Sequence, residues 1–133
     1  MEYLPNNDYS VDILAKNGEI IAMVPKIREV KSHGPSLVSK VDYNPKIVSL
    51  VKKISKVFNL NHNVNIQLRL GDDGEPYPYE INPRIAGTIA ACNHIGLNLI
   101  YYGIKLALKE VVKSPSKYKK NSTMIRYYEE LYE

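Results

Sequence analysis

The chain has 133 residues, a net charge of +4 and a single cysteine, Cys92. This length allows one domain with a modest core, the single cysteine excludes an internal disulfide framework and fits a reducing compartment, and no apolar run approaches the ~20 residues of a membrane-spanning helix. The first residues, M-E-Y-L-P-N-N-D, lack the basic and apolar regions of a signal peptide. We therefore expect a cytoplasmic protein with no membrane partner.

The start of the chain carries the pattern of a β-hairpin. Residues 9–14 (Y-S-V-D-I-L) alternate in polarity and are rich in strand-forming residues. The dipeptide Asn17-Gly18 follows, and Asn-Gly is the strongest short-range signal for a tight hairpin turn. Residues 19–25 (E-I-I-A-M-V-P) then supply the returning strand.

The next segment, residues 28–39, is polar and contains a turn signal, H-G-P-S, at residues 33–36. Its side chains Arg28, Lys31 and Ser32 could face a phosphate, or they could belong to a surface loop. We interpret the segment as a surface loop, because the sequence offers nothing further in favour of the phosphate.

Asn44 and Pro45 predict the start of a helix, since asparagine is a favoured N-cap and proline is favoured at the first helical position. The apolar residues that follow recur at helical spacing, while the lysines lie mostly off this stripe. The pattern predicts an amphipathic helix that covers the core and ends near Asn59. Its expected buried stripe is Ile47, Leu50, Val51, Ile54, Val57 and Phe58.

A second hairpin is predicted after this helix. Residues 63–70 (N-V-N-I-Q-L-R-L) alternate strictly, so the apolar side chains share one face and the polar ones share the other. The residues G-D-D-G at 71–74 form the turn, and Asp-Gly suits its two central positions. The resulting register pairs Gln67 with Glu80 and Asn65 with Asn82.

The same register explains the two prolines of the returning strand. It places Pro76 and Pro78 opposite Gly71 and Arg69 at non-hydrogen-bonded positions, where neither proline removes a ladder hydrogen bond. The apolar face of the strand then continues through Tyr77, Tyr79 and Ile81.

Residues 77–84 (Y-P-Y-E-I-N-P-R) carry the candidate chemistry of the chain. Glu80 and Asn82 are two residues apart in an extended strand, so their side chains project on the same face. Two oxygen ligands on one face suit magnesium, whose other positions are filled by water and phosphate. Pro83 should end the strand, and Arg84 beyond it has the planar fork that grips phosphate oxygens.

The remainder of the chain is predicted to be helical and then extended. Residues 87–93 can begin a helix of small residues, on which Cys92 and His94 lie on different faces and so form no metal pair. Asn98 caps a further helix. Its expected buried stripe is Ile100, Tyr101, Ile104, Ala107, Leu108 and Val111.

Four lysines follow this helix in a Ser/Pro-interrupted segment, which we interpret as a solvated linker. The lysines are Lys113, Lys117, Lys119 and Lys120. Nucleic-acid binding would require a broader basic face with interleaved aromatic residues, so the composition disfavours it. Residues 122–133 are expected to form a terminal strand or a docked tail.

The order of these parts resembles the ATP-grasp superfamily and is most similar to its carbamoyl-phosphate-synthase-like branch. The parts are a hairpin opening with E-Y-L-P-x-x-D-Y-S-V-D, a helix, a strand carrying glutamine, then E-I-N-P-R and a helix of small residues. The resemblance covers nearly the whole chain. It implies an α+β fold in which an antiparallel sheet is covered by helices, as in the C-terminal lobe of an ATP-grasp protein.

The resemblance implies a nucleotide site with ATP as cofactor. The Leu4 amide and the Glu2 carbonyl would contact the adenine ring, and Asp8 would accept hydrogen bonds from the ribose hydroxyls. Lys31 and Ser32 lie where a loop of the family lines the nucleotide.

The resemblance also assigns Gln67, Glu80 and Asn82 to the magnesium or manganese ions held against the nucleotide phosphates. Gln67 and Glu80 thereby belong to the nucleotide site as well. Arg84 matches the arginine that contacts the transferred phosphate or the acyl-phosphate intermediate, and it is the catalytic candidate. The implied reaction is ATP-dependent activation of an unidentified carboxylate to an acyl phosphate, followed by attack of an amine or another nucleophile.

Family members are typically much longer, and their small lobe covers the phosphates with a glycine-rich loop. This chain lacks that lobe, so we expect a partial ligase that is inactive alone. The missing lobe would lie in cis or on a partner chain, and the open face would favour a homo-oligomer. Residues 1–112 should form the lobe, and residues 113–133 a basic linker and a C-terminal strand packed on it.

Two other functions stay open at this point. One is a non-catalytic nucleotide-binding or interaction module that retains the fold. The other is a small basic α+β protein that binds nucleic acid, which would show strongly salt-dependent binding.

Overall fold

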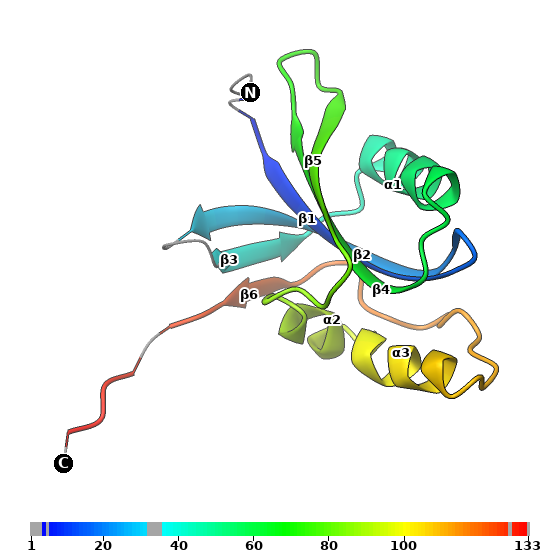
Figure 1. Cartoon of the computed structure of the whole chain (residues 1–133). Coiled ribbons are helices and arrows are strands. Elements are labelled where there is room, and N and C mark those ends of the chain that lie inside the picture. The colour runs from blue at the N-terminus through cyan, green and yellow to red at the C-terminus, as the bar shows by residue number, and fades with distance from the viewer. Residues whose placement is uncertain (1–3, 5, 32–35, 128, 133) are drawn as a thin grey trace.

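The computed structural model describes residue 4 and residues 6–31, 36–127 and 129–132. Within them the chain forms a six-stranded antiparallel sheet and three helices (Figure 1), so the predicted α+β class is confirmed. The strand order is β5-β4-β1-β2-β3-β6. In chain order the elements are β1 (Asp8–Lys16), β2 (Glu19–Lys31), β3 (Ser36–Val41), α1 (Pro45–Val57), β4 (His62–Leu70), β5 (Pro76–Asn82), α2 (Ala90–His94), α3 (Leu99–Ala107) and β6 (Thr123–Ile125).

The first hairpin, β1–β2, forms as predicted. Asn17 and Gly18 occupy its turn with φ angles of 50° and 78°, the left-handed conformation that this turn requires and that asparagine and glycine tolerate. The strand β1 lies at the centre of the sheet, between β2 and β4. It therefore carries side chains to both faces of the fold.

The predicted surface loop over residues 28–39 is wrong for most of its length. The strand β2 continues to Lys31, and β3 begins at Ser36 and pairs with it, with Arg28 opposite Ser39. Polar side chains suit strands here because one end of the sheet face opposite α1 carries polar residues instead of an apolar core. The assignment of Ser32 lies outside the described residues, as does that of Glu2.

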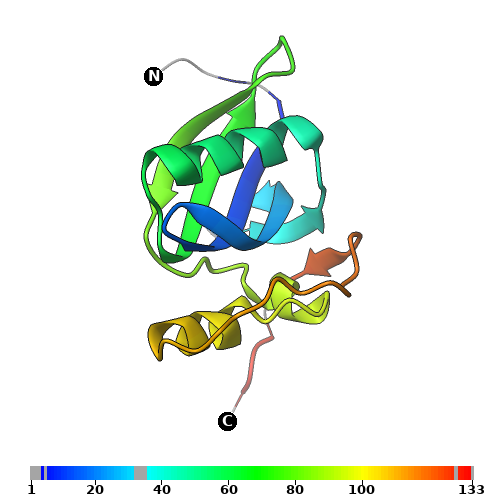
Figure 2. The same ribbon diagram turned by 90° about the vertical axis from the view of Figure 1, so that its right-hand side faces the viewer.

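Helix α1 covers one face of the sheet (Figure 2). The Asn44 side chain accepts a hydrogen bond from the Lys46 backbone N–H at 2.9 Å, which confirms the predicted cap. The helix ends at Val57, followed by Asn59 with a φ of 48°. The predicted stripe is wrong at its end, since Val57 and Phe58 are exposed beyond the edge of the core.

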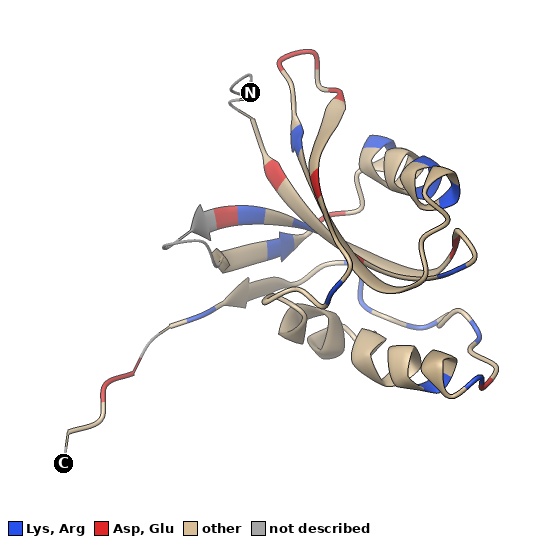
Figure 3. Ribbon diagram, in the orientation of Figure 1, with Lys and Arg blue, Asp and Glu red and all other residues tan. Residues whose placement is uncertain are grey.

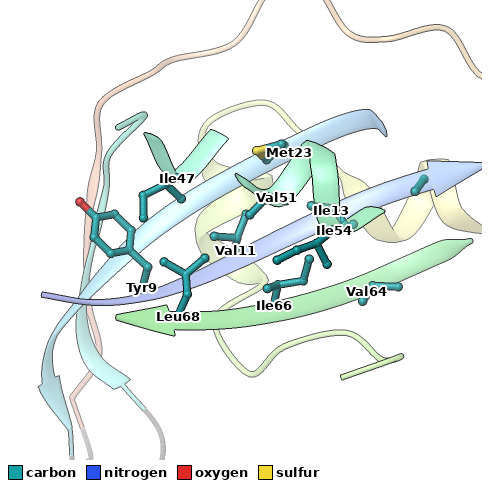
Figure 4. Packing of buried hydrophobic residues seen from close by; sticks show 11 residues of the cluster. Tyr9, Val11, Ile13, Met23, Ile47, Val51, Ile54, Val64, Ile66 and Leu68 are labelled. Atoms are coloured by element: carbon teal, nitrogen blue, oxygen red, sulfur yellow. The ribbon is translucent and has the colours of Figure 1, made fainter. Parts of the chain in front are cut away.

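Alternating residues of β1 and β4 meet α1 in a buried apolar cluster (Figure 4). Burying several aliphatic side chains here stabilises this half of the fold by roughly 1.5–3 kcal/mol for each side chain. The cluster consists of Tyr9, Val11, Ile13, Ala15, Met23, Ile47, Val51, Ile54, Val64, Ile66 and Leu68.

The β4–β5 hairpin confirms the predicted pairs and corrects the turn. Gln67 is opposite Glu80, and Asn65 is opposite Asn82. The turn, however, has three residues, because the Gly71 N–H donates to the Glu75 carbonyl at 2.8 Å. This loop length places a residue in the left-handed conformation at its third position, which Gly74 supplies with a φ of 70°.

The extra turn residue is compensated by a bulge further along the hairpin. The register shifts between Gln67 and Leu68, so Tyr79 is the unpaired residue on β5. Pro76 and Pro78 therefore oppose Leu70 and Leu68, and the predicted pairing with Gly71 and Arg69 is wrong. The bulge also turns Tyr79 away from the predicted apolar face and toward Gln67.

Helices α2 and α3 cover the other face of the sheet, and the Asn98 side chain caps α3 by accepting from the Tyr101 N–H at 3.0 Å. The predicted α2 start at residue 87 is early, since residues 87–89 form a turn. The predicted stripe of α3 is wrong, because Tyr101, Ile104, Ala107, Leu108 and Val111 are all exposed. The buried residues of α3 are Leu99, Gly103 and Leu106.

The face of α3 that carries Gly103 packs on the sheet, because the helix lies very close to β4 there. A Cβ atom at Gly103 would lie 1.9 Å from Asn63 Oδ1 on β4, and the Asn63 Nδ2 donates to the Leu99 carbonyl at 3.0 Å. Only glycine leaves room for this side chain. The helix face is thus chosen by proximity and not by total hydrophobicity.

The segment after α3 returns along the protein surface to form β6, which pairs with β3 at the sheet edge. Tyr118 packs against Tyr43 with ring centroids 6.1 Å apart, and the lysines of the segment are exposed. Figure 3 shows basic residues along this stretch between α3 and β6. No helix in the described part of the chain is long and apolar enough to cross a membrane.

Candidate nucleotide and metal site

The candidate site lies on the polar face of the sheet, at the end where β1 begins. We call its central residues, Asp8, Arg28, Gln67, Arg69 and Tyr79, the outer cluster. Asp8 opposes Arg69 on the neighbouring strand, and its carboxylate lies 3.6 Å from the guanidinium groups of both Arg28 and Arg69. Figure 3 shows charges of both signs gathered at this end of β1, β2 and β4.

Gln67 joins the outer cluster through its amide oxygen. Arg28 Nη1 donates to Gln67 Oε1 at 2.9 Å, and Arg28 Nε donates to Ser36 Oγ at 2.8 Å. The Tyr79 hydroxyl lies 2.9 Å from Gln67 Oε1 and 2.8 Å from Asp8 Oδ1. A hydroxyl has a single proton, so Tyr79 can donate to only one of these two oxygens at a time.

Tyr79 remains a donor across the physiological pH range. Burial, and then the hydrogen bond and negative charge of Asp8, raise the pKa of Tyr79 to about 12, while Arg28 acts in the opposite direction. Its single proton lies between two acceptors, one of them charged. Tyr79 thereby connects the predicted ribose ligand with the predicted metal ligand.

Glu80 and Asn82 follow directly beside this cluster on β5. Glu80 is exposed, and its carboxylate forms no hydrogen bond or ion pair with the described residues. The Asn82 Nδ2 is buried and has no partner among those residues either. A buried donor without a partner is rare in proteins. This N–H group could donate to a ligand oxygen, whereas ligation of Mg²⁺ would use the Asn82 Oδ1.

Arg84 lies just beyond the strand, as predicted. The strand β5 ends at Asn82, and the Arg84 backbone N–H donates to the Asn82 carbonyl at 2.8 Å. The Arg84 side chain is exposed, and its recorded contact is with the Ile85 carbonyl at 3.2 Å. It is therefore close in sequence to the metal candidates and remains accessible to solvent.

The donor set fits magnesium better than a transition metal. One carboxylate and two amide oxygens are hard ligands that leave several positions to water and phosphate. Among the described residues, no three His, Cys, Asp or Glu side chains cluster as a metal site, so a thiolate or imidazole centre does not compete there. Gln67 Oε1 could ligate the ion while keeping its hydrogen bond from Arg28, because the Tyr79 proton can go to Asp8 instead.

A second polar group lies deeper on the same face, and we call it the buried polar cluster: Ser10, Asp12, Lys26, Asn65 and Cys92. Lys26 and Asp12 form a buried ion pair. Asn65 Nδ2 donates to Asp12 Oδ1 at 2.9 Å and to Ser10 Oγ at 2.8 Å. The cluster separates the outer cluster from the apolar residues that pack under α2 and α3.

Cys92 lies at one side of the buried polar cluster, and its thiol is buried against Asp12 and Lys26. Its Sγ lies 3.4 Å from Asp12 Oδ2 and 3.7 Å from Lys26 Nζ. Burial is the main cause that raises the pKa of the Cys92 thiol to about 12, against the opposing effect of Lys26. We expect iodoacetamide at pH 8 to leave the native thiol unmodified, because only the thiolate reacts. Mass spectrometry should show full labelling in denaturant, and rapid labelling of the native protein would contradict this environment.

Sequence reasoning did not assign Arg69, Tyr79 or Lys26 to the site, and it placed Arg28 in a loop. The period-two pattern did put Arg69 on the same face as Gln67, which was the available signal. Tyr79 required the bulge to be known, and Lys26 required the register of β1 with β2. Lys31 ends β2, at the far end of this strand from the hairpin turn.

An open pocket of about 620 Å³ adjoins the outer cluster. Its lining residues are Asn6, Asn7, Asp8, Ile27, Arg28, Glu29 and Arg69. Two guanidinium groups and two carboxylates thus border the pocket, beside the strand that bears Gln67. A ligand in this pocket would therefore meet groups of both charges.

Solved structures of several enzymes share the fold of this chain. One is N5-carboxyaminoimidazole synthase from Aspergillus clavatus in complex with ADP and 5-aminoimidazole ribonucleotide, with a TM-score of 0.77, 15% identity, and coverage of 94% of this chain and 35% of that one. Another is the 2-oxoglutarate carboxylase biotin carboxylase domain of Hydrogenobacter thermophilus in complex with MgADP, ADP and bicarbonate, with a TM-score of 0.71, 16% identity, and coverage of 91% and 30%. A third is the L-amino acid ligase of Bacillus licheniformis, with a TM-score of 0.60, 20% identity, and coverage of 82% and 31%.

The chain therefore spans about a third of the length of these proteins. No curated protein matches the sequence. A family described as "ATP-grasp in the biosynthetic pathway with Ter operon" matches residues 1–131, nearly the whole chain. Together with the sheet, its register and its helices, this match makes the chain a member of that ATP-grasp family.

Proposed function

We propose that this chain is the Mg-ATP-binding lobe of an ATP-dependent carboxylate–amine ligase that acts through an acyl-phosphate intermediate. The observation that carries the proposal is the pairing of Gln67 with Glu80 on the polar face. This pairing brings two of the three predicted metal ligands together near the predicted ribose ligand, Asp8. Asn82 lies two residues further along β5, so its side chain is on the same face as that of Glu80.

The residues of this chain have distinct parts in the proposed site. Leu4 and Asp8 bind the nucleoside, and Gln67, Glu80 and Asn82 hold Mg²⁺. The bound ion neutralises negative charge on the phosphates, which is the main requirement of phosphoryl transfer. Arg84 binds the transferred phosphate, and its exposure leaves it free to do so.

The proposed ligase needs more chain than these residues provide. The outer cluster and its pocket open to solvent on one side, where the chain supplies no phosphate-covering loop within the described residues. The missing lobe belongs to the same polypeptide or to a partner, and it would contribute to selecting the carboxylate. We expect calorimetry to show weak binding of Mg-ATP to this chain; sub-micromolar affinity would contradict the proposed incompleteness.

The metal assignment is tested by replacing Glu80 with glutamine. Mn²⁺ binding, followed by electron paramagnetic resonance, should weaken roughly tenfold or more, because even the loss of an outer-shell partner costs 10–100-fold in metal affinity. The variant should remain folded, since the Glu80 side chain is exposed.

Glu75→Gln provides the matched control. Glu75 is an exposed glutamate of the same hairpin. Its carboxylate lies 2.6 Å from the ammonium of Lys46 on α1, away from the outer cluster. Its replacement should leave Mn²⁺ affinity unchanged. Equal effects of the two substitutions would remove Glu80 from the metal site.

A further inference from the structure

We propose that Arg69 is a positioning residue that holds the nucleobase-binding segment and the ribose-binding carboxylate at a set spacing. This inference rests on the proposed function, because Leu4 and Asp8 are nucleoside ligands only in that proposal. What it adds is a residue that contacts both of them, together with a test that separates its contribution from that of the metal ligands.

One guanidinium reaches both predicted nucleoside ligands. Arg69 Nη1 donates to the Leu4 carbonyl at 2.7 Å, and Arg69 Nη2 lies 3.6 Å from Asp8 Oδ2. The two nitrogens belong to one rigid plane, so one guanidinium links the Leu4 backbone, through a hydrogen bond, with the Asp8 carboxylate, through an ion pair. Few other side chains could make both contacts with so little freedom.

Two other contacts tie the described residues of the segment before β1 to the sheet. The Leu70 N–H donates to the Asn7 carbonyl at 3.1 Å, and Asn6 Nδ2 donates to the Gly71 carbonyl at 2.9 Å. Both contacts lie after Leu4 in the chain. Among the described residues, Arg69 is the side chain that donates a hydrogen bond to the Leu4 carbonyl.

The position of Arg69 on its strand allows it to make both contacts. It lies on β4 opposite Asp8 on β1, and its side chain is one-quarter exposed while that of Asp8 is 5% exposed. The Asp8 carboxylate also receives the Tyr79 hydroxyl at 2.8 Å and faces Arg28 at 3.6 Å. Asp8 is therefore held from several sides, and among the described residues Arg69 is the one of these side chains that also reaches the Leu4 carbonyl.

The contact geometry predicts a selective effect. Arg69 touches the residues that would bind the base and the sugar, and it is not among the predicted metal ligands. Loss of the Arg69 guanidinium should weaken binding of the nucleoside portion of the nucleotide and leave binding of its metal-bound phosphates unchanged. A residue needed only for folding would weaken both.

Arg69→Lys tests this, because lysine keeps the charge and cannot span two acceptors with a planar fork. The affinity of the full chain is measured for Mg-ADP and for Mg-pyrophosphate, which lacks the nucleoside. We expect the affinity for Mg-ADP to fall roughly tenfold, the cost of one charge-assisted hydrogen bond. The affinity for Mg-pyrophosphate should stay the same, and Arg69→Gln should weaken Mg-ADP at least as much.

Arg126→Lys is the matched control. Arg126 is a partly exposed residue whose guanidinium also donates to a backbone carbonyl, that of Gly87, at 2.7 Å and outside the outer cluster. Its replacement should not change binding of either probe. Thermal unfolding of both lysine variants verifies that each is folded.

The outcomes separate this inference from the proposed function. Two outcomes would show that Arg69 is not a positioning residue: unchanged affinity of its variants for Mg-ADP, or an equal loss of affinity for Mg-ADP and Mg-pyrophosphate. In either case the proposed function stands. If the unmodified chain binds no Mg-ADP at millimolar concentrations, the proposed function itself fails.

Discussion

Replacing Lys26 with methionine is expected to lower the free energy of unfolding by about 3–5 kcal/mol. Lys26 is fully buried, and its ammonium pairs with the almost fully buried Asp12 carboxylate. Methionine fills a similar volume but leaves that carboxylate without its counter-ion. Denaturation in urea should show a lower midpoint with an unchanged slope, because the surface exposed on unfolding stays the same.

Two further variants test whether the uncompensated charge is the cause. The double substitution Asp12→Asn and Lys26→Met removes both charges and keeps an acceptor for Asn65, so it should recover most of the lost stability. Lys46→Met breaks an ion pair in which both side chains are about half exposed, and it should cost at most about 1 kcal/mol. If Lys26→Met costs no more than Lys46→Met, the buried pair does not stabilise the fold.

Replacing Gly103 with alanine should destabilise the protein by about 1–3 kcal/mol, although alanine favours helix formation. The new methyl group would meet Asn63 Oδ1 at 1.9 Å. The Asn63 side chain would then have to leave, and its hydrogen bond to the Leu99 carbonyl would be lost with it. Thermal unfolding followed by circular dichroism measures the change.

Gly87→Ala is the control for this substitution. Nothing lies within 4 Å of a Cβ atom at Gly87, so its stability should change by less than about 0.5 kcal/mol. An alanine at residue 103 that left the melting temperature unchanged, or raised it, would show that α3 is not packed against Asn63 as described.

The elements with strong local signals could be predicted from the sequence. The Asn17-Gly18 turn, the Asn44 cap and the alternation over residues 63–70 each depend on neighbouring residues alone. The pairing of Gln67 with Glu80 was also correct, although through two compensating differences: the turn is one residue longer than predicted, and the bulge at Tyr79 restores the register.

The rest depended on contacts between residues far apart in sequence. The outer cluster exists because β1 lies between β2 and β4, which no local pattern of Arg28, Gln67 or Arg69 could reveal. The face of α3 was mispredicted because its largest apolar residues are exposed, while Gly103 makes the close contact. Such choices are set by tertiary packing and override local preference.

The central position of β1 also has a consequence for how the protein folds. The β1–β2 and β4–β5 hairpins are local structures that can form early, whereas the β1–β4 junction requires closing the long chain segment that includes α1. Asp8 stands on one side of that junction, and Gln67 and Arg69 stand on the other. The proposed nucleotide site is therefore assembled only when the two hairpins dock, so a chain stalled before this step would have much of its secondary structure without that site.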